Sequence, residues 1–352
     1  MKYNLIYIIF LAFIPSLLFS QVGGNSTYNF LNLTNSARSA ALGGKIVSLP
    51  DNDLDMTFHN PALLNREMDN NLVLNYVNYF SDINFGYVSY SRSFNNIGNF
   101  AAGIHYINYG RFTAADETGT ITGNFNASEY SFNLIYSRVL PIADSTLQVG
   151  VNLKPIISNF ESYTSFGLAT DLGINYISRQ GYFTAGLVFK NIGFQIKPYY
   201  KGNSEPLPFE IQLGVSQKLK HAPFRFIVVA QHLQKFKMTT PDDGSGGSDN
   251  IYNTDDSNNN FKQFGDNLLR HFIFGVEINP IKPIIIRLGY NYQRNRELRL
   301  SSKPGMVGFS WGFGVNLSKF QISYGHARYH LAGSSNHISL TLNLNEFGKK
   351  GL

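Results

Sequence analysis

The stretch Val307-Gly308-Phe309-Ser310-Trp311-Gly312-Phe313-Gly314-Val315-Asn316 decides the fold class, because large apolar residues alternate strictly with small or polar ones. Successive side chains of a β-strand point to opposite faces, so this stretch would have one apolar face and one lean polar face. The same period of two recurs in residues 284–293 and 337–344. Repeated segments of about ten residues with this alternation are typical of transmembrane barrels. We therefore predict an all-β fold, an antiparallel transmembrane β-barrel.

The composition fits a protein whose surface lies largely in a membrane. Charged residues are 15% of the 352 residues and aromatic residues are 14%, whereas soluble domains carry about 25% charged residues. Cysteine is absent, so disulfides and a lipid-bearing N-terminal cysteine are excluded. The net charge of +6 is thinly spread, without the basic block interleaved with aromatics that nucleic-acid binding needs. We expect outer-membrane lipid as a partner, and no nucleic acid.

Residues 1–20 have the features of an export signal peptide. Lys2 supplies the charged start, residues 5–19 supply an apolar run, and Gln21 follows a candidate cleavage site. An uncleaved anchor is the weaker alternative, because Pro15 interrupts the run and about 20 apolar residues are needed to span a bilayer. No later stretch reaches that length. Export without a helical span predicts a periplasmic, secreted or outer-membrane protein, and the alternating segments favour the outer membrane.

Fourteen segments with period-two alternation are flanked by turn residues, and we predict a strand at each. An even number of strands is typical of bacterial outer-membrane barrels, whose tilted strands need about nine to eleven residues to cross. The barrel is expected over residues 71–347, followed by a C-terminal tail, 348–352. The predicted strands are 71–79, 84–93, 98–109, 128–139, 145–155, 164–178, 181–191, 208–219, 223–233, 268–279, 283–293, 305–316, 319–329 and 336–345.

The lengths of the connections alternate along the chain. Connections after even-numbered strands are tight, as at 179–180 and 317–318, whereas those after odd-numbered strands include long loops at 111–126, 192–207 and 236–267. Outer-membrane barrels have short periplasmic turns and longer external loops. We therefore expect both termini to be periplasmic. A soluble all-β protein remains the alternative, because alternation alone also describes sandwiches.

Residues 21–70 do not have the pattern of strands, and we expect an N-terminal plug or hatch segment in the barrel lumen. A run of small residues spans 36–44, and a turn begins at 60. The acidic residues Asp51, Asp53 and Asp55 could receive a cation, but they lack the glycine and glutamate of a calcium loop. The motif residues expected to pack in the plug are Ser36, Ala37, Arg38, Gly43, Gly44, Asn60, Pro61 and Ala62.

This segment carries a resemblance to a known family. Residues 28–33 (Tyr-Asn-Phe-Leu-Asn-Leu), 36–44 (Ser-Ala-Arg-Ser-Ala-Ala-Leu-Gly-Gly) and 60–64 (Asn-Pro-Ala-Leu-Leu), followed by fourteen predicted strands, resemble the FadL-like outer-membrane barrels. Within that family the chain is similar to the PorV/PorQ group of Bacteroidetes type IX secretion proteins. The sharp motifs are confined to residues 28–64.

The resemblance implies a role in the type IX secretion attachment complex without enzymatic activity. The barrel would anchor a PorZ-like surface protein beside PorU-like and PorV-like components, which process secreted cargo and attach it to the cell surface. The sequence itself also indicates no enzyme, cofactor or metal site. It has no cysteine, and it lacks the Gly-x-Ser-x-Gly motif of a nucleophilic serine.

An acidic loop between the predicted ninth and tenth strands is the candidate partner-docking element. It is rich in glycine, serine and asparagine, and such composition predicts a solvated loop. Tyr252 would serve as an aromatic anchor for a partner. The candidate docking residues are Asp242, Asp243, Ile251, Tyr252 and Asp255.

Two other functions compete with the scaffold role. One is a FadL-like transporter of hydrophobic molecules, which would need a greasy pocket, for example among the loop aromatics Phe194, Tyr199 and Tyr200. The other is an open porin, which would require residues 22–70 to leave the lumen clear.

Overall fold

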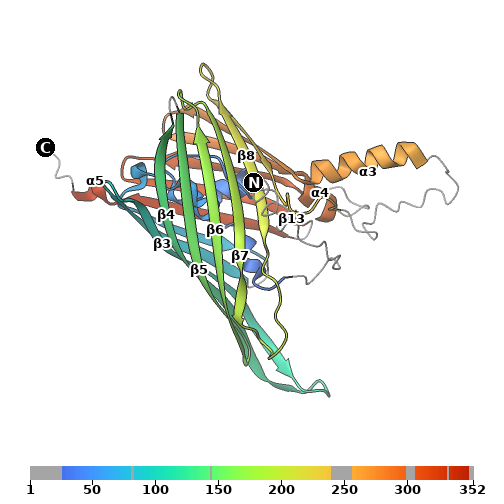
Figure 1. The fold of residues 1–352 in the computed structure, drawn as a ribbon. Helices are drawn as coiled ribbons and strands as arrows, with labels where there is room; N and C mark the ends of the chain where they lie inside the picture. Colours follow the sequence, from blue (N-terminus) through green and yellow to red (C-terminus); the bar gives the residue numbers. More distant parts are fainter. Residues whose placement is uncertain are drawn as a thin grey trace, which may run out of the picture.

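The computed structural model describes residues 26–80, 83–142, 145–238, 256–298, 306–330 and 333–348. Fourteen antiparallel strands close into one barrel, in which each strand pairs with its sequence neighbours and β1 pairs with β14 (Figure 1). The strands are β1 (Asn71–Asn78), β2 (Asn84–Phe94), β3 (Gly98–Ala115), β4 (Ile121–Ile142), β5 (Ser145–Phe160), β6 (Tyr163–Ile177), β7 (Phe183–Lys197), β8 (Glu210–Lys218), β9 (Phe224–Ala230), β10 (Phe272–Ile281), β11 (Ile284–Asn291), β12 (Phe309–Asn316), β13 (Phe320–His330) and β14 (Gly333–Asn343).

The helices are short, and most precede the barrel. Among the described residues, none is both long and apolar enough to cross a membrane. They are η1 (Asn29–Asn32), α2 (Ala37–Ala41), η2 (Leu54–Phe58), η3 (Pro61–Leu63), η4 (Arg66–Met68), α3 (Asp256–Arg270), α4 (Tyr292–Leu298) and α5 (Asn345–Gly348). We call the end of the barrel with the connections after even-numbered strands the turn end, and the opposite end the loop end.

The alternation in sequence becomes an apolar outside and a small or polar inside. On β12 the side chains of Phe309, Trp311 and Phe313 are 46–49% exposed, whereas Ser310 and Gly312 are buried. In a membrane barrel the exposed apolar face meets lipid, where a charged side chain would cost about 2–4 kcal/mol near the midplane. The predicted fold class, a fourteen-stranded antiparallel barrel, is confirmed.

Several predicted boundaries were wrong at the loop end. The expected loop 111–126 is mostly a continuation of β3 and β4, which form a hairpin that projects beyond the barrel (Figure 1). Stacking of Phe112 on Phe125, with ring centroids 5.2 Å apart, favours this cross-strand pairing. Similarly, β7 continues to Lys197 through the first residues of the expected loop 192–207.

Two predicted strand ends are helical instead. Residues 268–270 belong to α3, which the Asp266–Arg270 pair stabilises at the favourable i, i+4 spacing. Residues 292–293 belong to α4, because Asn291 ends the strand and its side chain accepts a hydrogen bond from the Arg294 backbone amide, as at a helix start.

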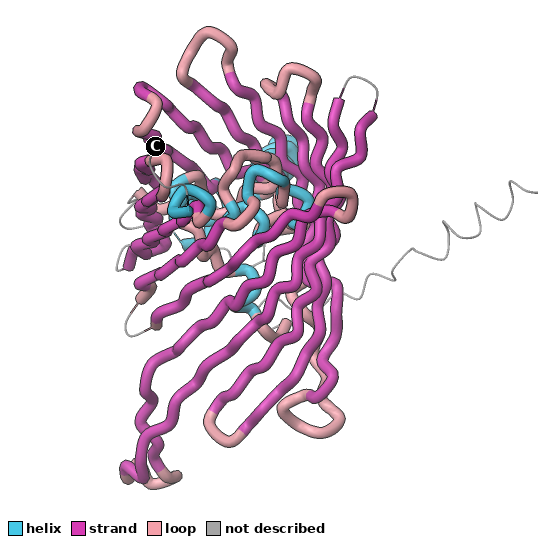
Figure 2. Tube along the Cα trace, turned by 90° about the vertical axis from the view of Figure 1, so that its left-hand side faces the viewer, coloured by secondary structure: helices cyan, strands magenta, loops and turns pink. Residues whose placement is uncertain are grey.

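Residues 26–70 lie inside the barrel, where Figure 2 shows their short helices surrounded by strands. A core cluster joins plug residues such as Leu42, Met56 and Leu63 to the wall residues Val188 and Ile273. The inward face of the wall is made of small residues, so the plug backbone approaches it closely. A Cβ added at Gly150 would lie 2.4 Å from the carbonyl carbon of Pro61, and one at Gly325 would lie 2.2 Å from the Ala37 oxygen.

We predict that Gly150→Ala destabilises the protein, because the added methyl group meets plug backbone that has no room to move. Overpacking of this kind typically costs about 1–3 kcal/mol. The free energy of unfolding in lipid bilayers, measured by guanidinium titration, tests this. Gly123→Ala is the matched control, because a Cβ at that strand position has no atom within 4 Å. Equal stability of the two variants would contradict close packing of η3 on the wall.

Candidate functional site

The small-residue run of the plug forms helix α2 and the turn after it. Ser36 caps the helix by accepting a hydrogen bond from the Ser39 amide, and the Ala37 amide donates to the Ser339 hydroxyl at 2.9 Å. Gly43 and Gly44 have φ of 100° and 108°, which side chains rarely adopt, so glycine is required to end the helix here. The helix is therefore held against β13 and β14 by its own backbone.

Arg38 extends from α2 into a buried cluster of charges. Its guanidinium donates from Nε to Glu277 Oε1 at 2.8 Å and from Nη2 to Glu277 Oε2 at 2.8 Å, a bidentate pair. It also donates to Asp51 at 2.6 Å and to Asp53 at 3.2 Å. A single plug arginine thus binds two acidic residues of the plug and one of the wall.

Two wall arginines complete this ion-pair cluster. Arg225 of β9 donates to Asp51 at 2.6 Å and to Glu277 at 3.2 Å, and Arg287 of β11 donates to Glu277 at 3.0 Å. Three arginines balance three carboxylates, and Glu277 is the acceptor that all three arginines share.

The ion-pair cluster lies near the turn end, where it borders a polar cavity of about 340 Å³. Arg38, Asp53, Glu277 and Arg287 are each at most 3% exposed, so removing one partner would leave a buried charge uncompensated. Burial alone would raise the pKa of Asp51, but Arg38 and Arg225 hold it below its usual range. Asp51 therefore stays ionised, and the cluster joins plug to wall.

The three aspartates expected as a possible cation site have other partners. Asp51 and Asp53 pair with arginine, while Asp53 also caps η2. Asp55 is buried and accepts a hydrogen bond from the Asn75 amide of β1 at 2.5 Å. Burial and the neighbouring Asp53 raise the pKa of Asp55 to about 7. In the described part of the chain, no group of three or more histidines and acidic residues could hold a metal ion.

The Asn60-Pro61-Ala62 motif joins three parts of the molecule. The Asn60 Oδ1 accepts from the Ala62 amide at 3.0 Å and so caps η3, with Pro61 at its first position. The Asn60 Nδ2 donates to the Val47 carbonyl at 2.8 Å and to the Ile174 carbonyl of β6 at 3.4 Å. This motif fixes a turn of the plug between the extended plug segment at Val47 and the wall.

A second set of buried charges lies nearer the loop end and was missed from sequence. Lys45 of the plug donates to Glu210 at 2.5 Å, and on the wall Lys154 donates to Asp171 at 2.5 Å. For Lys154, Asp171 and Glu210 only the inward strand parity was visible in the sequence, because the partners come from the plug or from a different strand. The Lys45–Glu210 pair joins the plug to β8, and the Lys154–Asp171 pair joins β5 to β6.

Nearer the loop end, apolar side chains of the plug pack against the wall. Plug residues Tyr28, Phe30 and Leu31 pack with the wall residues in an apolar cluster, which we call the upper apolar cluster. Tyr199, in the connection between β7 and β8, packs against it. The other buried members of the upper apolar cluster are Val77, Phe85, Ile107, Ile156, Ala169 and Leu207.

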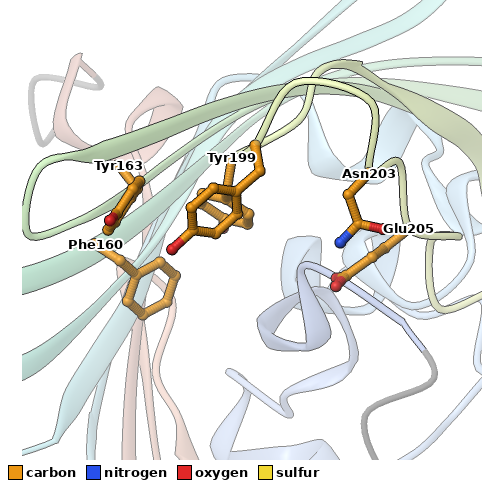
Figure 3. Close-up of a pocket in the computed structure, with 6 residues that line it drawn as sticks. Phe160, Tyr163, Tyr199, Asn203 and Glu205 are labelled. Carbon is orange, nitrogen blue, oxygen red and sulfur yellow. The ribbon is translucent and has the colours of Figure 1, made fainter.

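At the loop end, next to this cluster, lies an aromatic pocket of about 250 Å³. In Figure 3 the aromatic rings gather on one side, while Asn203 and Glu205 lie on the other. Phe160 and Tyr199 meet edge to face at 5.8 Å, and Tyr163 and Tyr200 lie 4.8 Å apart. The pocket is lined by Phe160, Tyr163, Tyr199, Tyr200, Asn203 and Glu205.

The pocket is connected to the plug by hydrogen bonds. The Glu205 amide donates to Gln195 at 2.7 Å, the Gln195 amide group donates to Ser165 at 3.2 Å, and Ser165 is bonded to the Tyr28 hydroxyl. The Thr27 amide also donates to the Pro206 carbonyl at 3.0 Å. The start of the described plug is thus tied to the loop that forms the pocket.

Sequence reasoning located part of this pocket. Of the three loop aromatics considered, Tyr199 and Tyr200 line it, whereas Phe194 is 61% exposed and lies outside the lining. Phe160 and Tyr163 were missed because their hairpin was expected to be a longer loop. The candidate docking residues 242, 243, 251, 252 and 255 lie outside the described residues, and so does the expected signal peptide, residues 1–20.

The architecture matches that of solved outer-membrane barrels, although no family model and no curated protein matches the sequence. The toluene transporter TodX of Pseudomonas putida aligns with a TM-score of 0.50 and 12% identity, over 88% of this chain and 98% of TodX. The toluene transporter TbuX of Ralstonia pickettii aligns with a TM-score of 0.48 and 10% identity, over 89% of this chain and 98% of TbuX. A FadL homologue of Pseudomonas aeruginosa aligns with a TM-score of 0.45 and 10% identity, over 88% of this chain and 98% of the homologue.

The alignment with TodX and the closed fourteen-stranded barrel define the class of protein. The chain has the fold of the FadL-like outer-membrane barrels. At this level of identity, the likeness establishes the fold alone.

We predict that Glu277→Gln destabilises the protein by about 3–5 kcal/mol, because the new amide group donates toward arginines that are already donors. Asp69→Asn is the control, since Asp69 and Arg92 form a partly exposed pair 3.9 Å apart, and such pairs contribute about 0–1 kcal/mol. Guanidinium unfolding in lipid bilayers measures both changes. Equal losses would show that the ion-pair cluster does not hold the plug.

We predict that Asp55→Asn stabilises the protein by more above pH 7 than at pH 5. The pKa of Asp55, raised to about 7, lies above that of an unfolded aspartate, so the folded state binds the extra proton and loses stability as the pH rises from about 4 to 7. Asparagine does not ionise, so the variant does not lose stability in this way. Thermal unfolding in detergent at pH 5 and pH 8 should show a difference between variant and wild type that grows with pH; a constant difference would contradict the raised pKa.

Proposed function

We propose that this outer-membrane barrel binds small hydrophobic molecules at its loop end and admits them into the lumen. The aromatic pocket is the observation that carries this proposal. Binding sites for small molecules are concave and mostly apolar, with a few polar groups that orient the ligand. Four aromatic rings with Asn203 and Glu205 form such a lining.

The size of the pocket indicates the class of ligand. An engineered apolar cavity of about 150 Å³ holds benzene, so a pocket of about 250 Å³ suits a substituted aromatic ring or a short acyl chain. The four rings supply the apolar contact, and Asn203 and Glu205 supply the polar groups that would orient the ligand.

A path inward is also apolar at its start. Tyr199 belongs to the pocket lining and packs on the upper apolar cluster. An apolar ligand that moves inward from the pocket would therefore stay in contact with apolar side chains. Residues 26–70 occupy the lumen below, which argues against an open porin for hydrophilic solutes. TodX, a toluene transporter with the same fold, supports the same class of cargo.

The second candidate is the scaffold role in a type IX secretion attachment complex, which the resemblance to PorQ suggests. Two observations favour it: the plug is fixed by buried ion pairs, and the β3–β4 hairpin projects beyond the barrel, where it could contact a PorZ-like surface protein (Figure 1). The motifs for this finer assignment are confined to residues 28–64. We rank it second because the pocket is explained by a small ligand and not by a scaffold.

We predict that the double variant Tyr163→Ala/Tyr200→Ala weakens binding of radiolabelled toluene to the purified protein by about tenfold, because two of the rings that cover the ligand are lost. Phe112→Ala removes an exposed ring from a stacked pair outside the pocket, and it should leave the affinity unchanged. Absence of binding by the wild type, together with stoichiometric recovery of a surface protein from the outer membrane, would move the assignment to the scaffold.

A further inference from the structure

Helix α3 projects from the rim of the barrel at the loop end (Figure 1). It is amphipathic, since the apolar and the polar residues of its C-terminal half separate onto two sides at 3.6 residues per turn. In a soluble protein the apolar side of such a helix would cover the core. In α3 the arrangement is the opposite: the polar side faces the protein and the apolar side faces outward.

The polar side of α3 faces the protein. Asp266 pairs with Arg270 on the same helix, with Arg296 of α4 at 2.8 Å, and with the Tyr292 hydroxyl at 2.8 Å. The Asn267 side chain accepts a hydrogen bond from the Met238 amide at 3.1 Å. These contacts set the rotation of the helix about its own axis.

The apolar side is consequently uncovered. Phe264, Leu268 and Leu269 are 41–49% exposed although they are large and apolar. Phe236, on the segment after β9, is 69% exposed and places its ring 5.9 Å from that of Phe264. These four residues form one exposed apolar surface, which we call the α3 surface.

The α3 surface continues the lipid-facing surface of the barrel. Helix α3 ends at Arg270 and β10 begins at Phe272, whose ring lies 6.2 Å from that of Phe274 on the outward face. Phe274 is 41% exposed, as expected for a side chain that meets lipid. On the neighbouring strand, Tyr290 contacts Tyr292 of α4, so aromatic rings also line the rim beside α3. Aromatic belts of this kind mark the membrane interface.

We propose that α3 is an interfacial anchor whose Phe264, Leu268, Leu269 and Phe236 insert into the membrane leaflet at the loop end. The occupant of the α3 surface is lipid, because the surface is continuous with the outward face of β10 and its polar side is already used by the protein. Amphipathic helices bury their apolar face at the boundary between headgroups and acyl chains. The anchor would hold the β9–β10 connection down on the membrane, beside the barrel mouth.

The test places a tryptophan on each side of the helix and measures quenching by lipid. Trp311 is the chain's one tryptophan and faces lipid on β12, so it is replaced by phenylalanine in the test variants and kept in the wild type as the positive control. F264W reports the apolar side. Q263W, an exposed position on the polar side, is the matched control. L268W is a second reporter in case substitution of Phe264 disturbs the helix.

Each variant is reconstituted into phosphatidylcholine vesicles with and without phosphatidylcholine brominated on its acyl chain. We expect the brominated lipid to quench F264W and L268W at least twofold more than Q263W. Equal quenching of the two sides, while Trp311 in the wild type is quenched, overturns the proposal. A reporter that is protected only at high protein density also overturns it, and indicates that a second copy covers the α3 surface.

Discussion

The bidentate pair between Arg38 and Glu277 is the interaction on which the rest of the structure depends. It joins the plug to the wall at a position where neither group meets bulk water, and Asp51, Asp53, Arg225 and Arg287 are arranged around it so that charges balance. Breaking one contact would leave several buried charges without partners. The plug is therefore an integral part of the barrel, because the inward charges of the wall and the charges of the plug neutralise each other.

This constraint also explains the composition of the wall. Because the plug fills the lumen, inward positions must be small where backbone approaches, as at Gly150 and Gly325, and must be charged or polar where the plug supplies a partner. The outward positions meet lipid and are large and apolar. The strict alternation in residues 307–316 follows from both requirements, because inward and outward positions alternate along one strand. The low content of charged residues follows, because the charges are largely confined to the lumen and the rim.

Those same requirements show why the fold was predictable from sequence and much of the site was not. Period-two alternation fixes strand number and side-chain direction locally, so the fourteen strands could be predicted. The pairing of Arg38 with Glu277 joins residues 239 positions apart and depends on where the plug sits in the closed barrel, which no local pattern contains. Helix α3 was missed because an apolar pair, Leu268-Leu269, before β10 has the appearance of a strand start. Its polar partners lie on α4, a helix of which only the first two residues were expected to be strand and the rest loop.

The distribution of forces within the plug decides where a hydrophobic molecule could enter. From α2 to η3 the plug is held by ion pairs, helix caps and close backbone contacts, so displacement of this part would expose buried charges. Around Tyr28 and Leu31 it is held by apolar contacts, which an apolar ligand could replace, and by a few hydrogen bonds. The weaker part lies beneath the aromatic pocket and the stronger part lies at the turn end. A ligand that enters at the pocket therefore meets the part of the plug that costs least to move, while the ion-pair cluster keeps the opposite end closed.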